Sequence, residues 1–198
     1  GPYSDEIGVG DLNGDSNLDL AVVNLARGIS LLIGLGDGTF RQAGLVSMGN
    51  PSNVIVADIN ADGRLDLVAS NGAYWNIFTF LGKGDGTFEE PKVVDLGTTV
   101  TSMAAGDFDE DGKIDLAVIE YYVERIAILI GDGQGNFASN PYWMLSTGYA
   151  PQSIALGDFD GNGHQDLAVT NYGGPAVEIL PGLGNGRFGY AHPVNSGE

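Results

Sequence analysis

Residues 107–118 read DFDEDGKIDLAV and place five carboxylates within nine residues of sequence. The five are Asp107, Asp109, Glu110, Asp111 and Asp115. Like charges about 4 Å apart repel each other by roughly 1 kcal/mol per pair in water and by about 4 kcal/mol near a protein surface. A folded chain that concentrates acids in this way needs a compensating interaction.

The acidic stretch occurs four times. The copies are DLNGDSNLDLAVV from Asp11, DINADGRLDLVAS from Asp58, DFDEDGKIDLAVI from Asp107 and DFDGNGHQDLAVT from Asp158, with starts 47, 49 and 51 residues apart. A second motif keeps the same spacing: GLGDGTF ends at Phe40, GKGDGTF at Phe88, GDGQGNF at Phe137 and GLGNGRF at Phe188. Two motifs with one common period near 49 residues predict a repeat protein.

Each repeat is predicted to form four β-strands. In the second repeat the apolar, β-branched and aromatic runs are Asn53–Ile59, Leu65–Ser70, Ile77–Leu81 and the more polar Thr87–Val94. The glycines of GKGDG supply the positive φ angles that a tight hairpin needs. Four antiparallel strands in about 49 residues are typical of a β-propeller blade, so we expect an all-β fold. The 32 glycines argue against helices.

We expect a single propeller domain with four blades, at about residues 3–48, 49–96, 97–147 and 148–198. Three arrangements of these blades are consistent with the sequence: a closed four-blade ring, half of an eight-blade ring formed by a homodimer, or a fragment of a larger propeller. Gly1-Pro2 resembles the remnant of a protease site used to remove a tag, so we expect the chain to be a piece of a longer protein.

The acidic loops are predicted to bind Ca²⁺, one ion per repeat. Oxygen-bearing side chains recur at loop positions 1, 3, 5 and 9, and position 7 varies, as expected where only a backbone carbonyl is used. The five positions are Asp11, Asn13, Asp15, Asn17 and Asp19; Asp58, Asn60, Asp62, Arg64 and Asp66; Asp107, Asp109, Asp111, Lys113 and Asp115; and Asp158, Asp160, Asn162, His164 and Asp166. Hard oxygen ligands without Cys favour Ca²⁺ over zinc or copper, and Mg²⁺ prefers to keep its waters.

These repeats resemble the FG-GAP family in its VCBS-type form. The shared residues are D-x-[DN]-x-[DN]-G-x-x-D-L, an Asn-containing turn and L-x-G-x-G-D-G-T-F, and integrin α-subunit propellers are distant relatives. The resemblance implies a β-propeller with calcium in the loop between the first two strands of each blade. The chain departs from the family in the missing Gly-Ala-Pro after the second strand, which argues against integrin-like ligand chemistry, and in holding four blades where the family commonly builds seven. The first loop also has Ser16 where the other loops have Gly63, Gly112 and Gly163, so we expect strain in that turn.

Composition and charge disfavour some classes of partner and indicate where we expect the protein to be located. The formal charge of −18, from 26 acidic and 8 basic residues, disfavours nucleic acid and anionic membranes. No apolar run reaches the 18 residues needed to span a bilayer, so we expect no membrane insertion. Because extracellular modules can rely on millimolar Ca²⁺, we expect a secreted or cell-surface protein.

The face opposite the calcium loops is predicted to bind a glycan or a protein, in carbohydrate binding or cell adhesion. It collects aromatic rings, amides and one arginine: Asn71, Tyr74, Trp75, Asn76, Tyr121, Tyr122, Arg125, Tyr149, Asn171 and Tyr172. We expect no catalysis, because the carboxylates have metal-site spacing and neither His164 nor His192 suits a catalytic triad. The alternative is a non-catalytic structural domain of a larger secreted enzyme, such as a polysaccharide-degrading enzyme.

Overall fold

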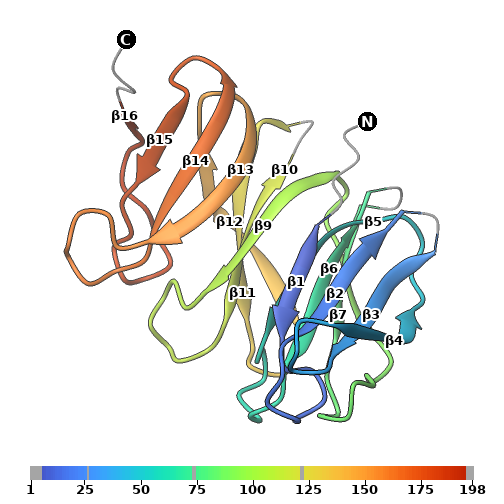
Figure 1. The fold of residues 1–198 in the computed structure, drawn as a ribbon. Coiled ribbons are helices and arrows are strands. Elements are labelled where there is room, and N and C mark those ends of the chain that lie inside the picture. The colour runs from blue at the N-terminus through green and yellow to red at the C-terminus, as the bar shows by residue number, and fades with distance from the viewer. Residues whose placement is uncertain (1–5, 26, 73–74, 121–122, 195–198) are drawn as a thin grey trace. The chain divides into compact units, whose positions relative to one another are not determined.

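A computed structural model describes residues 6–25, 27–72, 75–120 and 123–194. Within these residues, sixteen strands form four four-stranded antiparallel sheets, and none of these residues lies in an α-helix (Figure 1). The same ranges therefore contain no helix long and apolar enough to cross a membrane. The predicted all-β fold with four propeller blades is confirmed.

Each blade consists of four strands that follow one another in the chain and pair with their neighbours. The first blade contains β1 (Ile7–Gly10), β2 (Asp19–Asn24), β3 (Gly28–Gly34) and β4 (Phe40–Val46). The second contains β5 (Pro51–Ala57), β6 (Asp66–Asn71), β7 (Asn76–Phe80) and β8 (Lys92–Asp95). The third contains β9 (Val100–Gly106), β10 (Asp115–Glu120), β11 (Arg125–Gly131) and β12 (Phe137–Ser146). The fourth contains β13 (Tyr149–Gly157), β14 (Asp166–Gly173), β15 (Val177–Leu180) and β16 (His192–Val194).

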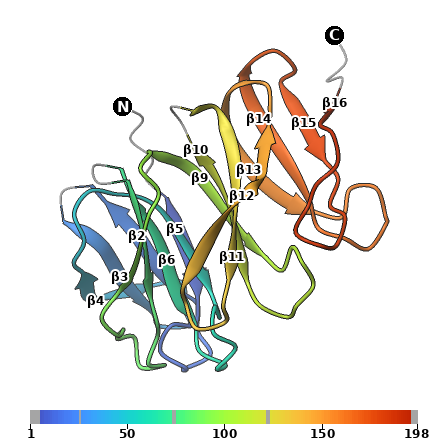
Figure 2. The same ribbon diagram turned by 180° about the vertical axis from the view of Figure 1, so that it is seen from behind.

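The chain divides into two compact units of two blades each. The first unit is Gly1–Thr99 with Gly133–Asn136, and the second is Val100–Asp132 with Phe137–Glu198. The third and fourth blades, which make up most of the second unit, are seen from behind in Figure 2.

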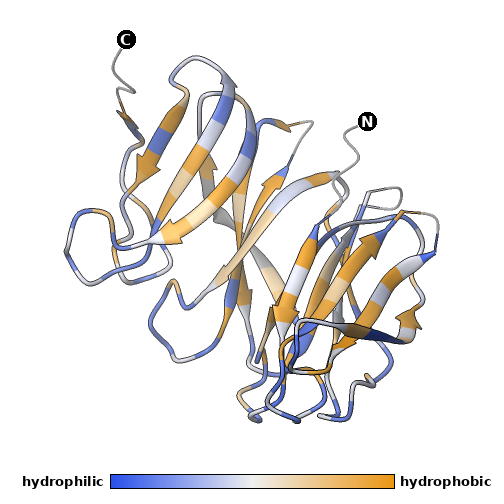
Figure 3. Ribbon diagram, in the orientation of Figure 1, coloured by the Kyte–Doolittle hydropathy of each residue, from blue (hydrophilic) through white to orange (hydrophobic). Residues whose placement is uncertain are grey.

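Each unit has its own apolar core, to which both of its blades contribute. In the first unit Leu31 of β3 and Leu67 of β6 belong to one buried cluster. In the second unit Ile128 of β11 and Leu167 of β14 do the same. Full burial of one such side chain stabilises a fold by roughly 1.5–3 kcal/mol. The strands are rich in apolar residues and the turns in hydrophilic ones (Figure 3), so burial of the strand faces holds the blades of a unit together.

The fourth strand of the second blade is shorter than predicted. It begins at Lys92 rather than Thr87, with an isolated bridge between Gly82 and Phe88. The Glu89 amide donates to the Leu81 carbonyl at 2.8 Å, and Pro91 has no amide hydrogen with which to continue the ladder.

The fourth blade repeats this interruption. Gly182 bridges Phe188, and the Gly189 amide donates to the Pro181 carbonyl at 2.7 Å before β16 begins at His192. A looped segment therefore precedes the last strand in the second blade of each unit.

A glycine follows or ends the third strand of every blade at the same place. These glycines are Gly34, Gly82, Gly131 and Gly182. A Cβ added at Gly82 would lie 2.1 Å from the carbonyl oxygen of Leu65, and the other three positions have equivalent contacts of 2.0–2.2 Å. Only glycine lets the third strand approach the end of the acidic loop this closely.

We therefore expect Gly82→Ala to lower the free energy of unfolding by about 1–3 kcal/mol, because the methyl group must displace a backbone carbonyl. Chemical denaturation of the parent and variant proteins measures this difference. Gly44→Ala in β4 is the matched control, since a Cβ there meets no atom within 4 Å. Equal losses for both variants would contradict the close-approach explanation.

Candidate metal centres and ligand face

The four acidic loops occupy equivalent places in the four blades. Each joins the first strand to the second, and the aspartate at position 9 is the first residue of the second strand. Burial differs between the positions of the loop. The position-5 side chains are exposed, whereas all four position-9 aspartates have 0% exposure. In the first three loops the side chains at positions 1 and 3 are half-buried, so each of these loops has candidate ligand oxygens at three depths.

The position-1 aspartate holds the loop closed through backbone amides. In the third loop the Asp107 carboxylate accepts hydrogen bonds from the amides of Asp111, at 3.1 Å, and Gly112, at 2.9 Å. The other three loops contain the equivalent pair of bonds from positions 5 and 6. The position-1 carboxylate therefore fixes the backbone of the loop in the same way in all four blades.

Positions 4 and 6 of every loop have positive φ angles. Position 4 is Gly14 (77°), Ala61 (56°), Glu110 (60°) and Gly161 (77°). Position 6 is glycine in three loops, with φ of 83–87°, and Ser16 in the first, with φ of 70°. A non-glycine residue in this region is strained by roughly 1–2 kcal/mol. The expectation that Ser16 introduces strain into the first loop agrees with this geometry.

The position-9 aspartate connects three parts of its blade. In the third blade Asp115 accepts a hydrogen bond from the Phe108 amide in the loop at 3.0 Å and another from the Gly131 amide at the end of β11 at 2.9 Å. Both bonds are buried, and the pattern recurs at Asp19, Asp66 and Asp166. The glycine that allows the third strand to approach the loop therefore also donates its amide hydrogen bond to this carboxylate. Sequence reasoning missed this bond, although the glycine follows the aspartate by 15 residues in the first repeat and by 16 in the other three.

Burial and neighbouring charges perturb the loop acids. Burial raises the pKa of Asp115 to about 6 and also raises the pKa of Asp66. The pKa of Asp109 is raised mainly by burial and further by the carboxylates of Asp111 and Asp107. Hydrogen bonds lower the pKa values of the exposed position-5 acids, from the Asn17 amide at Asp15 and from the Lys113 side chain at Asp111. A nearby cation would stabilise the ionised form of the buried acids.

The geometry brings candidate ligand oxygens together. In the third loop, oxygens of Asp107, Asp109 and Asp115 lie within 4.8 Å of one another, and the fourth loop contains the equivalent cluster of Asp158, Asp160 and Asp166. The first two loops have Asn13 and Asn60 at position 3, whose oxygens are amide rather than carboxylate oxygens. These donor sets fit a hard divalent cation such as Ca²⁺.

The position-7 side chains point to carboxylates. Lys113 pairs with Asp111 at 2.5 Å and Arg64 with Asp62 at 3.8 Å, each within its own loop. His164 places Nδ1 2.5 Å from Glu110 Oε1, which links the two loops of the second unit. The side chains of Arg64, Lys113 and His164 are thus paired with carboxylates, and a ligand role for the backbone carbonyl of position 7 stays a prediction.

Three aromatic residues of the predicted ligand face are exposed at the strand ends opposite the acidic loops. Trp75 precedes β7 and is 46% exposed, and Tyr149, at 63%, begins β13. Tyr172, at 84%, lies near the end of β14. Three other residues predicted for this face, Tyr74, Tyr121 and Tyr122, lie outside the described residues.

Three of the four polar residues predicted for this face, Asn71, Arg125 and Asn171, pair with other groups of the fold. Asn71 is 2% exposed and donates its side-chain amide to the Gly49 carbonyl, so its assignment to a solvent-facing ligand set is wrong. The half-buried Arg125 pairs with the buried Glu120.

The remaining two amides are also half-buried. Asn171 donates to Glu178 Oε2 at 2.9 Å, and Asn76 lies opposite Asp95 in the register of β7 and β8. Glu178 also accepts a hydrogen bond from the Gly148 amide at 2.7 Å, so it holds in place the residue just before β13. Sequence reasoning did not identify Glu178 because the two groups that it joins lie far apart in the chain.

Comparisons with known proteins agree with this repeat architecture. A family model described as FG-GAP-like repeat matches residues 11–69, 58–118 and 107–169, and one described as FG-GAP repeat matches residues 150–192. Human integrin alpha-IIb is 28% identical over 158 residues, which cover 64% of this chain but 15% of the integrin.

Two solved structures share the fold at low identity. One is an Agrocybe aegerita lectin, in a study of specific recognition of non-reducing terminal N-acetylglucosamine. Its TM-score is 0.68 at 16% identity, covering 94% of this chain and 51% of the lectin. The other is BBS1N in complex with ARL6DN, with a TM-score of 0.64 at 17% identity, covering 95% of this chain and 52% of that one. The chain thus spans about half the length of these structures.

Proposed function

Because this chain belongs to the FG-GAP repeat family, we propose that it is a calcium-stabilised extracellular binding module that recognises a glycan or protein ligand. The repeats and their integrin and lectin relatives support a binding module in general. The observation that carries the ligand assignment is the exposure of Trp75, Tyr149 and Tyr172 at the strand ends opposite the acidic loops.

The four acidic loops are proposed to hold one Ca²⁺ each. The ligands would be the side-chain oxygens of positions 1, 3, 5 and 9 and the carbonyl of position 7. The ion would neutralise acids that otherwise repel one another, and the loop amides already hold the position-1 carboxylate in place. The exposed aromatic rings would then stand on a rigid blade, which lowers the entropic cost of binding.

Aromatic rings suit both proposed ligand classes. A flat ring offers an apolar surface to the C–H face of a sugar or to a side chain of a protein partner, and Trp and Tyr dominate interface energetics. The fourth blade provides two such rings at one end, Tyr149 on β13 and Tyr172 on β14. With a net charge of −18, nucleic acid is a poor ligand.

We expect the double variant Tyr149→Ala/Tyr172→Ala to weaken ligand binding by about tenfold or more, because two exposed rings are lost. A glycan array and pull-downs from extracellular matrix identify the ligand, and calorimetry then measures the affinity. Tyr190→Ala is the matched control, since Tyr190 is 93% exposed in the segment before β16.

Unaltered binding by the double variant would exclude these rings as the ligand face. Blank arrays and pull-downs would instead favour the second candidate, a non-catalytic structural domain of a larger secreted enzyme. The paired or half-buried state of Asn71, Arg125 and Asn171 is the observation that favours this candidate.

A further inference from the structure

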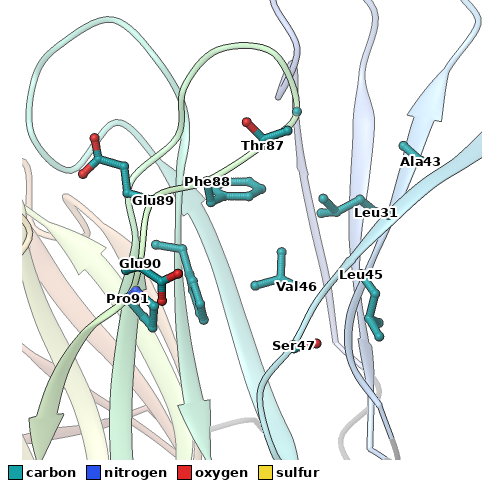
Figure 4. A pocket seen from close by; sticks show the side chains of 13 residues that line it. Leu31, Ala43, Leu45, Val46, Ser47, Thr87, Phe88, Glu89, Glu90 and Pro91 are labelled. Atoms are coloured by element: carbon teal, nitrogen blue, oxygen red, sulfur yellow. The ribbon is translucent and has the colours of Figure 1, made fainter.

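A groove separate from the ligand face runs along the outer strand of the first blade. It lies between β4 and the looped segment that precedes β8, and it has a volume of about 380 Å³ (Figure 4). Leu31, Val46, Phe80 and Phe88 form apolar walls, and the Phe88 ring points toward Leu31 and Val46. None of the residues predicted for the ligand face lines this groove.

One side of the groove is an open strand edge. Among the described residues β4 pairs only with β3, so its second edge has backbone groups that no strand satisfies. A β-bulge interrupts the pairing between Leu31 and Leu32, opposite Ala43, and Gly44 to Ser47 continue beyond it along the groove. Four residues of strand span about 13 Å. An extended peptide of that length would both pair with this edge and bury apolar side chains against Val46 and Phe88.

The charge of the groove lining indicates which kind of peptide the groove would bind. Glu90 lies beside Pro91 at the groove, and its side chain is exposed, while the Glu89 carboxylate points away from Leu31 and Val46 (Figure 4). No lysine or arginine lines the groove, and the whole chain carries a net charge of −18. An extended segment with apolar side chains and a cationic side chain on the same face complements this lining.

The groove geometry recurs in the second unit. Leu145, Leu180 and Phe188 take the positions of Val46, Phe80 and Phe88 in a groove of about 500 Å³. Tyr190 stands there in place of Glu90. The interrupted fourth strand thus produces a groove twice, but only the groove of the first unit has acidic residues in its lining, Glu89 and Glu90.

We propose that the groove of the first unit is a strand-addition site for a short, extended segment of a protein partner that carries apolar side chains and a basic side chain on one face, at every second residue. The segment adds to the open edge of β4, its apolar side chains contact Phe88 and Val46, and a basic side chain pairs with Glu90. This site does not depend on the proposed ligand face.

The test uses the acetylated and amidated peptide Val-Thr-Val-Thr-Lys, whose valines and lysine share one face of an extended strand, with a fluorescent label, and the full chain in calcium. Fluorescence anisotropy should show saturable binding at micromolar to millimolar peptide. Glu90→Lys should weaken binding about tenfold, whereas Glu89→Lys, with the same charge change one residue away, should change it less than about twofold. In NMR spectra the amides of Gly44 and Leu45 should shift, while that of Leu145 should not.

Two peptide controls separate strand addition from attraction to an acidic surface. N-methylation of alternate residues on the edge that faces β4 should abolish binding, and methylation of the opposite edge should not, because only one edge donates hydrogen bonds. Equal binding of both methylated peptides, equal effects of the two lysine variants, or no saturable binding would overturn the proposal. A chain dimer that Leu45→Lys abolishes and the peptide does not displace would assign the groove to a second copy and also overturn it.

Discussion

Excess EGTA is expected to lower the melting temperature of this protein by about 20 °C or more, or to unfold it at room temperature. If free Ca²⁺ is about 100 times the dissociation constant, each bound ion adds roughly 2.7 kcal/mol to stability. Four sites together approach the whole stability of an ordinary domain, about 5–15 kcal/mol. For a chain of 198 residues each kcal/mol corresponds to a shift of roughly 2–4 °C.

The measurement is a thermal melt followed by circular dichroism in calcium and in EGTA, and calorimetric titration of the stripped protein gives the number of ions bound. Excess Mg²⁺ should restore only a small part of the lost stability, because Mg²⁺ retains its waters. A melt that is unchanged by EGTA would contradict a structural role for calcium.

Asp109→Asn provides a control whose sign should change with calcium. The side-chain oxygen of Asp109 accepts the Asp111 amide at 3.2 Å, and asparagine keeps this acceptor while removing the charge. In EGTA the variant should melt slightly above the parent, because the carboxylates of Asp107 and Asp111 are no longer repelled by a third carboxylate. In calcium it should melt below the parent, because an anionic ligand is missing.

The sequence contained enough information to predict the blades because their signal is repeated four times. Apolar strands, glycine turns and acidic loops recur in phase, so each copy supports the interpretation of the others. The second repeat shows how accurate the predicted strand bounds are: three of its four strands lie within two residues of them. The fourth is wrong at its start, because Pro91 and the bond from Glu89 to Leu81 interrupt the ladder.

The sequence could not predict which polar residues face solvent at the strand ends. Asn71 and Tyr172 both follow an apolar run near the end of a second strand, yet one is 2% and the other 84% exposed. The difference depends on the partner that each side chain meets, such as the Gly49 carbonyl for Asn71, and that partner lies elsewhere in the chain. The sequence likewise could not predict the groove beside β4, since the two sides of the groove come from different blades.

The position-9 aspartate was predicted only as a calcium ligand, but its hydrogen bonds give it a second role that mutation can separate. We expect Asp115→Ala, in calcium, to lower the free energy of unfolding by about 3–5 kcal/mol. The buried amides of Phe108 and Gly131 lose their acceptor, at roughly 1–3 kcal/mol each, and the proposed ion loses a ligand. Denaturant titration measures the loss.

Asp115→Asn and Asp111→Ala distinguish the two roles of the carboxylate. Asparagine keeps one oxygen for one of the two amides, so its loss should be about half that of alanine. Asp111 is exposed and accepts only from Lys113 and its amide among the bonds described, so its replacement should cost far less than that of Asp115 in EGTA. In hydrogen exchange the Phe108 and Gly131 amides of Asp115→Ala should become much less protected, whereas those of Asp111→Ala should not. If all three variants lost equal stability in calcium and none in EGTA, ion binding alone would explain the buried aspartate.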